Sequence, residues 1–296
     1  MLREFIFATF AACCSVAAHA DTLQKIKDTG RVTLGVRESS GVLSYTTGDK
    51  YVGFHVELCL RALADIQKQL GLPKLEIKYL SVTSANRMAL VQNGTIDMEC
   101  GSTTNNSVRQ KEVSFALTTY VEEIRIAVKS NSDINSITQL SGRKVVTTTG
   151  TTSVQLLRRH ERANGVDFQE TFAKDHAESM LMLGSNRADA FVMDAQVLAG
   201  NIAQSLRPAD FKIVGETLGV EPIAIMMRKD DAALKQSVDN TLRGLMVSRE
   251  IAQIYDKWFM KPIPPTGAVL NLPPSKATLA AWASPNTRPA EEYSVR

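Results

Sequence analysis

Apolar positions along the chain follow two spacings, and the alternation between them predicts a mixed α/β fold. From 55 to 70, apolar residues recur at intervals of three and four, which predicts an amphipathic helix that ends at Gly71. Short segments at 32–36, 75–80 and 120–129 predict strands, the first of them buried and the last rich in β-branched residues. Strands that alternate with helices in this way indicate sheets flanked by helices.

One part of this pattern occurs twice. The segment from Met88 to Asp97 has an apolar helix end, a polar break and an Asp before a strand, and the segment from Met180 to Asp189 has the same order. The strands that begin after Gly30 and Gly142 also match. Two repeated patterns that occur in the same order predict two similar α/β lobes.

Two long β-branched segments lie where the chain would cross between such lobes, at Tyr120–Lys129 and Lys212–Met227. If both cross, lobe 1 is discontinuous and consists of residues 21–121 plus 222–296, and lobe 2 consists of residues 122–221. Two crossing strands form a hinge that permits the lobes to close over a ligand. Helices are expected from Asp230 to Ser248 and from Arg249 to Phe259. The last ten or so residues are expected to be unstructured.

The first twenty residues have the layout of a secretory signal peptide. Arg3 precedes an apolar run from Phe5 to Ala18, and Ala18-His-Ala20 is a small-x-small cleavage site. A buried N-terminal helix and a lipid anchor at Cys13 are the less favoured alternatives. No later stretch is apolar for the ~18 residues that a membrane helix needs. The mature chain is therefore predicted to begin at Asp21, in the periplasm and without a membrane span.

Composition narrows the possible functions. The chain has 296 residues, 44% of them hydrophobic and 22% charged, with a formal net charge of +3. Lys and Arg form no basic run of the kind that nucleic acid requires. We find no CxxC, no His spacing typical of zinc, no nucleophile elbow and no phosphate loop.

Cleavage at residue 20 would leave Cys59 and Cys100, which either pair in an oxidising compartment or remain two buried thiols.

Polar side chains follow the predicted strands, at the sheet edge where ligands bind in open α/β folds. The strand 95–100 runs into a loop of hydroxyls and amides, Gly101-Ser-Thr-Thr-Asn-Asn106, and Arg109 follows it. Arg37 and Arg87 follow two other predicted strands, the latter in a helix that Ser84 is expected to cap. Planar guanidinium groups suit carboxylates. The sequence therefore predicts a cleft that binds an acidic ligand.

The second repeat supplies the opposite charge. Asp194 ends its strand and would face the cleft as the anion, while His176 could donate to a carboxylate. Asp97 and Asp189 are expected only to turn the chain before a strand. Met98, Met180, Met182 and Met193 are expected in the core. Glu99 is expected to point away from the cleft, because it lies within a strand.

These motifs resemble those of the glutamate/aspartate-binding proteins within bacterial solute-binding protein family 3, which serve ABC importers. The resemblance covers nearly the whole mature chain. It is carried by Arg37-Glu-Ser-Ser, Thr83-Ser-Ala-Asn-Arg87, Glu99-Cys-Gly-Ser-Thr-Thr-Asn-Asn106, Gly150-Thr-Thr-Ser153, Ala173-Lys-Asp-His176, Met193-Asp194 and Trp258-Phe-Met-Lys-Pro-Ile-Pro-Pro265. Segments 115–120 and 220–223 depart from the family pattern. The resemblance implies the type II periplasmic-binding-protein fold, no cofactor and no bound metal.

The resemblance also implies a role for each cleft residue. Arg109, with Thr104 and Thr152, would bind the α-carboxylate of L-glutamate or L-aspartate. Asp194 and Ser102 would bind the α-amino group. The side-chain carboxylate would be held by Arg37, Arg87, His176 and Ser84. The expected protein is a monomer that docks on the permease of an importer in the inner membrane.

Two other functions are compatible with the same fold. A few exported enzymes, such as cyclohexadienyl (arogenate) dehydratases, use an acidic residue in such a cleft, and Glu99 with Asp194 could form an acid pair. A soluble amino-acid sensor would use the same site without transport. Turnover of a carboxylated ring, or binding to a receptor, would distinguish these alternatives from an importer component.

Overall fold

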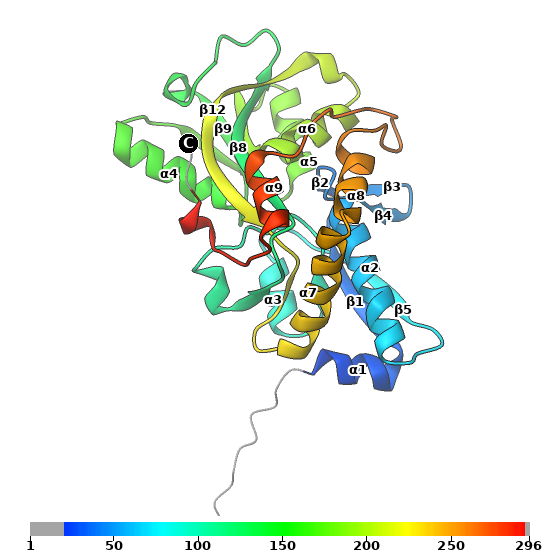
Figure 1. Ribbon diagram of the computed structural model, residues 1–296. Coiled ribbons are helices and arrows are strands. Elements are labelled where there is room, and N and C mark those ends of the chain that lie inside the picture. The colour runs from blue at the N-terminus through cyan, green and yellow to red at the C-terminus, as the bar shows by residue number, and fades with distance from the viewer. Residues whose placement is uncertain (1–20, 294–296) are drawn as a thin grey trace, which may run out of the picture.

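The computed structural model describes residues 21–293, and the predicted signal peptide with its two cysteines lies outside them. Two five-stranded sheets, each covered by helices, stand one above the other (Figure 1). Sheet 1 has the strand order β5-β1-β6-β13-β7, and sheet 2 has the order β10-β9-β11-β8-β12. The predicted α/β class is therefore confirmed.

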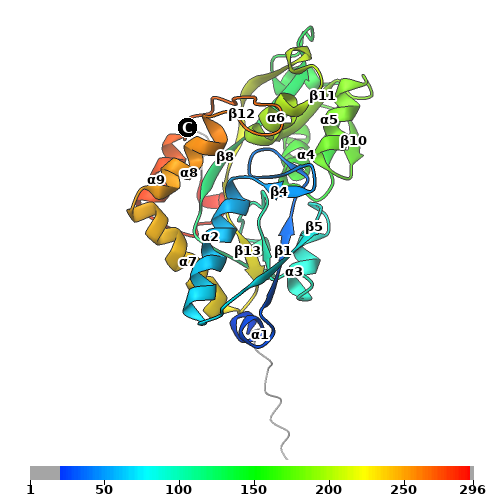
Figure 2. The same cartoon turned by 90° about the vertical axis from the view of Figure 1, so that its right-hand side faces the viewer.

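Sheet 1 and its helices are built from two separate parts of the chain, one before β8 and one after β12. Its strands are β1 (Arg31–Val36), β5 (Glu76–Ser81), β6 (Met98–Glu99), β7 (Val113–Phe115) and β13 (Met226–Arg228). Its helices are α1 (Thr22–Thr29), α2 (Phe54–Gln69), α3 (Arg87–Gln92), α7 (Ala232–Val247), α8 (Glu250–Phe259) and α9 (Lys276–Ala283). A small hairpin sheet is formed by β2 (Ser39–Ser40), β3 (Ser44–Thr47) and β4 (Lys50–Val52). The largest apolar core lies between sheet 1 and helices α2, α7 and α8 (Figure 2).

Sheet 2 is built from the middle of the chain. Its strands are β8 (Tyr120–Lys129), β9 (Lys144–Thr148), β10 (Gln169–Ala173), β11 (Ala190–Asp194) and β12 (Phe211–Ile223). Its helices are α4 (Thr152–Asn164), α5 (His176–Gly184) and α6 (Ala195–Gln204). One core includes Leu156 and Leu157 of α4, and another includes Leu183 of α5 and Val197 of α6. Both faces of the sheet are therefore buried, as parallel strands require.

The two sheets repeat one topology. In each, three parallel strands in the order second-first-third are followed by an antiparallel strand, β13 in sheet 1 and β8 in sheet 2. The two predicted turn aspartates also match. The carboxylate of Asp97 accepts a hydrogen bond from the backbone N–H of Thr33, and that of Asp189 accepts one from Lys144, both at 2.8 Å. Each aspartate thus fastens the third parallel strand to the first.

The strands β8 and β12 pair antiparallel from Tyr120 opposite Ile223 to Lys129 opposite Phe211, with a bulge between Val214 and Gly219. The expected lobe boundaries, after residues 121 and 221, fall inside these two strands. The segment predicted as one crossing from Lys212 to Met227 is two strands, β12 and β13. Its second strand joins sheet 1.

The C-terminal end corrects the expectation of an unstructured tail. After α9, residues 284–293 run along the hinge strands and include a 3₁₀ turn, η4 (Ala290–Glu292). The N–H of Thr118 donates to the carbonyl of Asn286 at 2.9 Å, and the N–H of Ala290 donates to that of Asn105 at 2.9 Å. Ser107 donates to the carboxylate of Glu291 through both its N–H and its hydroxyl. These bonds hold a polar segment whose composition alone gives no sign of order.

Candidate functional site: a buried charged cleft

All nine residues predicted to bind a ligand lie at the carboxyl ends of parallel strands. On sheet 1 they follow β1, β5 and β6, and on sheet 2 they follow β9 and β10 or end β11. Each is at most 9% exposed: Arg37, Ser84, Arg87, Ser102, Thr104, Arg109, Thr152, His176 and Asp194. The charges of Arg37, Arg87, Arg109 and Asp194 also affect one another's pKa values, which indicates that these four side chains face a common cleft.

The two sheet edges touch across this cleft. A guanidinium N–H of Arg109 donates to the carbonyl of Gly150 at 3.2 Å, and the hydroxyls of Thr104 and Thr152 lie 3.4 Å apart. At the other end of the cleft, the amide of Asn201 donates to the carbonyl of Ser39 at 2.9 Å. The cleft is therefore closed, and its charged groups are shielded from water.

Closure also depends on two glycines that face each other. Gly41 follows β2 and Gly200 lies in α6, and a Cβ on Gly200 would lie 2.6 Å from the Cα of Gly41. Backbone occupies the space that any larger residue would need, so the two sides could not approach as closely.

We expect Gly200→Ala to weaken ligand binding about tenfold, because a clash with backbone costs ~1–3 kcal/mol in the closed form. Folding stability should not fall, since Ala is the better helix former. Gly244→Ala is the matched control, because Gly244 lies in α7 with open space around it. Calorimetric titration of both variants checks this, and equal affinities would show that the contact does not limit closure.

Two of the three arginines are buried with guanidinium nitrogens that make no hydrogen bond within residues 21–293. These are both Nη atoms of Arg37, and Nε and Nη1 of Arg87. Burial, and then the charge of Arg87, lowers the pKa of Arg37 to about 9, and burial also lowers the pKa of Arg87. Arg109 differs, because it donates to the carbonyls of Thr104 and Gly150. Two buried cations with free donors favour a bound anion.

Asp194 supplies the opposite sign from sheet 2. Neither of its carboxylate oxygens has a hydrogen-bond partner among the described residues. Burial, and then the charge of Glu221, raises the pKa of Asp194 to about 8, against the opposing effect of the arginines. A cation with N–H donors, such as an ammonium group, would compensate for this burial.

His176 begins α5 and is fully buried. Its Nδ1 lies 2.9 Å from the hydroxyl of Thr148, and its Nε2 is without a partner in the part of the chain that is described. Burial, and then the charges of Arg37 and Arg87, holds the pKa of His176 well below its usual value. The imidazole is therefore neutral at pH 7, and Nε2 would suit a carboxylate as a donor.

Ser84 does not cap a helix as the sequence suggests. Helix α3 begins at Arg87 with Asn86 as its N-cap residue, and Thr83 and Asn86 exchange two hydrogen bonds in the turn before it. This turn takes the place of a serine cap. The hydroxyl of Ser84 is buried without a partner in residues 21–293, so it remains free for the role predicted in the cleft.

Two acidic residues of the cleft are absent from the predicted set. Glu221 of β12 accepts hydrogen bonds from the hydroxyls of Thr104 and Thr152 at 2.6 and 2.7 Å. Glu99 was expected to point away, yet its Oε1 lies 3.7 Å from a guanidinium nitrogen of Arg87, and Thr103 donates to its Oε2 at 2.7 Å. The segments that contain them also have other acids, Asp97 and Glu216, so no sequence signal distinguishes Glu99 and Glu221.

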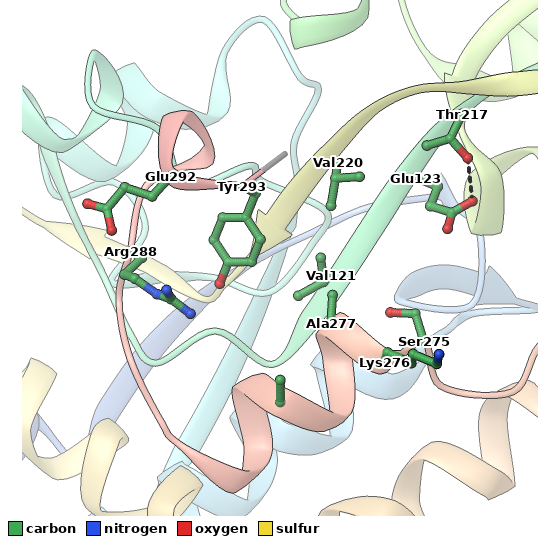
Figure 3. Close-up of a pocket in the computed structure, with 11 residues that line it drawn as sticks. Val121, Glu123, Thr217, Val220, Ser275, Lys276, Ala277, Arg288, Glu292 and Tyr293 are labelled. Carbon is green, nitrogen blue, oxygen red and sulfur yellow. Dashed lines mark hydrogen bonds between the residues drawn. The ribbon is translucent and has the colours of Figure 1, made fainter. Parts of the chain in front are cut away.

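A second hollow, of about 500 Å³, lies behind the hinge strands and holds none of the predicted residues. Figure 3 shows Val121 and Val220 from the hinge on one side of it, and Arg288 and Tyr293 from the C-terminal segment on the other.

Within residues 21–293, three or more His, Cys, Asp or Glu side chains nowhere gather as they would around a metal ion. Over the same residues, no helix combines the length and apolar character needed to cross a membrane.

Two α/β lobes that close on a buried charged cleft, joined by two strands, define the class of solute-binding proteins. The chain belongs to the bacterial extracellular solute-binding proteins, family 3, whose model matches residues 32–261. It is 42% identical over 291 residues to the L-glutamate/L-aspartate-binding protein of Pseudomonas aeruginosa, covering 96% of each chain. It is 38% identical to the glutamate/aspartate import solute-binding protein of Escherichia coli, covering 92% of this chain and 90% of that one.

Solved structures show the same two-lobed fold. An ancestral arginine-binding protein bound to glutamine superimposes with a TM-score of 0.69 at 28% identity, over 78% of this chain and 98% of that chain. A variant of the arginine-binding protein ArgBP from T. maritima superimposes with a TM-score of 0.71 at 23% identity, over 81% of this chain and 99% of that chain. The fold class predicted from the sequence is thereby confirmed.

Proposed function

We propose that this protein captures L-glutamate and L-aspartate in its cleft, binds glutamine and asparagine more weakly, and delivers the amino acid to an ABC permease in the inner membrane. It acts as a periplasmic monomer without catalysis, after cleavage of residues 1–20. The lobes in this proposal are residues 21–121 with 222–296, and residues 122–221.

One observation carries the proposal: buried guanidinium nitrogens of Arg37 and Arg87 and the carboxylate oxygens of Asp194 all lack hydrogen-bond partners among residues 21–293. A dicarboxylic amino acid has two carboxylates and one ammonium group. Each of these ions would cost several kcal/mol if it were buried without a partner. The cleft contains donors for carboxylates on Arg37 and Arg87 and an acceptor for an ammonium group on Asp194.

The roles that we propose are those that the family resemblance implies. Arg109, with the hydroxyls of Thr104 and Thr152, binds the α-carboxylate, and Asp194 with Ser102 binds the α-amino group. Arg37, Arg87, His176 and Ser84 bind the side-chain carboxylate. The names of the two relatives described above, both glutamate/aspartate-binding proteins, support the choice of ligand.

Calorimetric titration of the mature protein with the twenty amino acids tests the function. We expect tight binding of glutamate and aspartate, weaker binding of glutamine and asparagine, and no binding of basic amino acids. Binding of arginine without glutamate would refute the ligand assignment. Turnover of prephenate or arogenate would favour the enzyme alternative, and mass spectrometry of exported protein would test a start at Asp21.

Arg87→Ala should lower glutamate affinity about 100-fold, since a side-chain carboxylate would lose its buried partner at a cost of ~3 kcal/mol. Glutamine should lose less than about tenfold, because its carboxamide is neutral. Parallel titrations with the two amino acids measure the difference. Equal losses would mean that Arg87 does not contact the side-chain end of the ligand.

A further inference from the structure

Glu99 is a buried acid that the proposed ligand-binding roles do not use. It lies in β6, at the centre of sheet 1, between β1 and β13, and its side chain is fully shielded from solvent. The hydroxyl of Thr103 fixes Oε2 at 2.7 Å, whereas Oε1 has no hydrogen-bond partner among residues 21–293. Such a group is expensive to bury, so its presence beside the cleft requires an explanation.

The position of Oε1 places it among the arginines. It lies 3.7 Å from Nη1 of Arg87. Oε1 and the side chain of Arg37 also pack against the same glycine, Gly101. A Cβ on Gly101 would lie only 2.2 Å from Oε1 and 2.7 Å from the Cγ of Arg37. The charge of Glu99 opposes the lowering of the pKa of Arg37, Arg87 and Arg109 alike. Glu99 therefore acts on the two cations assigned to the ligand side chain.

Glu99 contributes to the balance of charge in the cleft. If Asp194 binds the ligand ammonium, the three guanidinium groups are left to compensate Glu99, Glu221 and the two ligand carboxylates. A carboxylate close to Arg37 and Arg87 stabilises them before the ligand arrives, and it repels a second carboxylate that comes to the same place. A neutral carboxamide at that place is repelled far less.

We propose that Glu99 is a built-in counter-ion that positions Arg87 and limits how strongly the cleft prefers a side-chain carboxylate over a carboxamide. The inference rests on the proposed function and deepens it. The charge of Glu99 stabilises the ligand-free protein. The same charge reduces the preference for glutamate and aspartate, so glutamine and asparagine also bind as weaker ligands.

The test is Glu99→Gln, which removes the charge at nearly constant shape. We expect the ratio of glutamate affinity to glutamine affinity to rise about tenfold, and the ligand-free protein to melt at a lower temperature. Glu99→Asp keeps the charge and should keep the ratio within about threefold of the wild type. Glu76→Gln is the matched control, because Glu76 is an exposed acid of the same sheet, paired with Arg31 at 2.9 Å.

A purely structural role for Glu99 would weaken both ligands together, and an unchanged ratio would overturn the inference. If the wild type binds neither glutamate nor glutamine, the proposed function fails instead, so the two failures are distinguishable. If Glu99→Gln does not fold, the double variant Glu99→Gln/Arg87→Gln should fold again, because it removes both members of the buried pair. Failure of the double variant to fold would also overturn the inference.

Discussion

Arg109→Ala is expected to reduce glutamate affinity by about 10³-fold, and aspartate and glutamine affinity by the same factor. All amino acids present an α-carboxylate, and loss of its buried cationic partner costs ~3–5 kcal/mol. Arg109 also donates to Thr104 on its own side of the cleft and to Gly150 on the other side. Its removal therefore weakens closure as well as the contact with the ligand.

Calorimetric titration of Arg109→Ala with the three amino acids checks this prediction. Arg143→Ala is the control, because Arg143 is a half-exposed arginine that pairs with Asp133 away from the cleft. Arg109→Lys should recover only part of the affinity, since lysine lacks the planar fork of donors. If Arg109→Ala binds glutamate within tenfold of the wild type, the α-carboxylate is bound elsewhere.

Loss of the disulfide between Cys59 and Cys100 is expected to lower the free energy of unfolding by about 4 kcal/mol. The bond joins α2 to the end of β6 across 41 residues, and an entropic estimate for a loop of this length gives that value. The sequence leaves the pairing open. Both residues are fully buried, so the bond is protected from solvent in the folded protein.

Urea unfolding of Cys59→Ala/Cys100→Ala measures this loss. Wild-type protein unfolded in the presence of a reductant should show the same shift in midpoint. Because Cys100 directly precedes Gly101 and the loop that carries Ser102 and Thr104, the double variant should also bind glutamate less tightly. A loss below about 1 kcal/mol would show that sheet 1 is held by its apolar core alone.

Much of the fold can be predicted from sequence because local and global signals agree. The strand from Tyr120 to Lys129 has the predicted bounds, and Gly30 ends α1 in a left-handed conformation, where glycine is favoured. The candidate residues could be placed at one edge of each sheet because the strands that precede them are parallel. The edge where such strands end is set by topology rather than by details of packing.

The errors occur where distant segments decide the outcome. Glu99 contacts Arg87 and Thr103, and Glu221 contacts Thr104 and Thr152. Strand periodicity contains no information about these contacts. Ser84 lost its predicted capping role to a local exchange between Thr83 and Asn86. Residues 284–293 are ordered by hydrogen bonds to Asn105, Ser107 and Thr118. Such bonds leave no apolar pattern in the sequence, so the order of this segment could not be predicted.

The course of the C-terminal segment has a practical consequence for handling the protein. Tyr293 lies beside the hinge strands, so a fluorophore attached at a cysteine substituted for Tyr293 would lie next to Val121 and Val220. Helix α1, which starts at Thr22, lies at the far end of the molecule from these strands (Figure 1). A fluorophore at Tyr293 would therefore report on movement of the two sheets, whereas one on α1 would be insensitive to it.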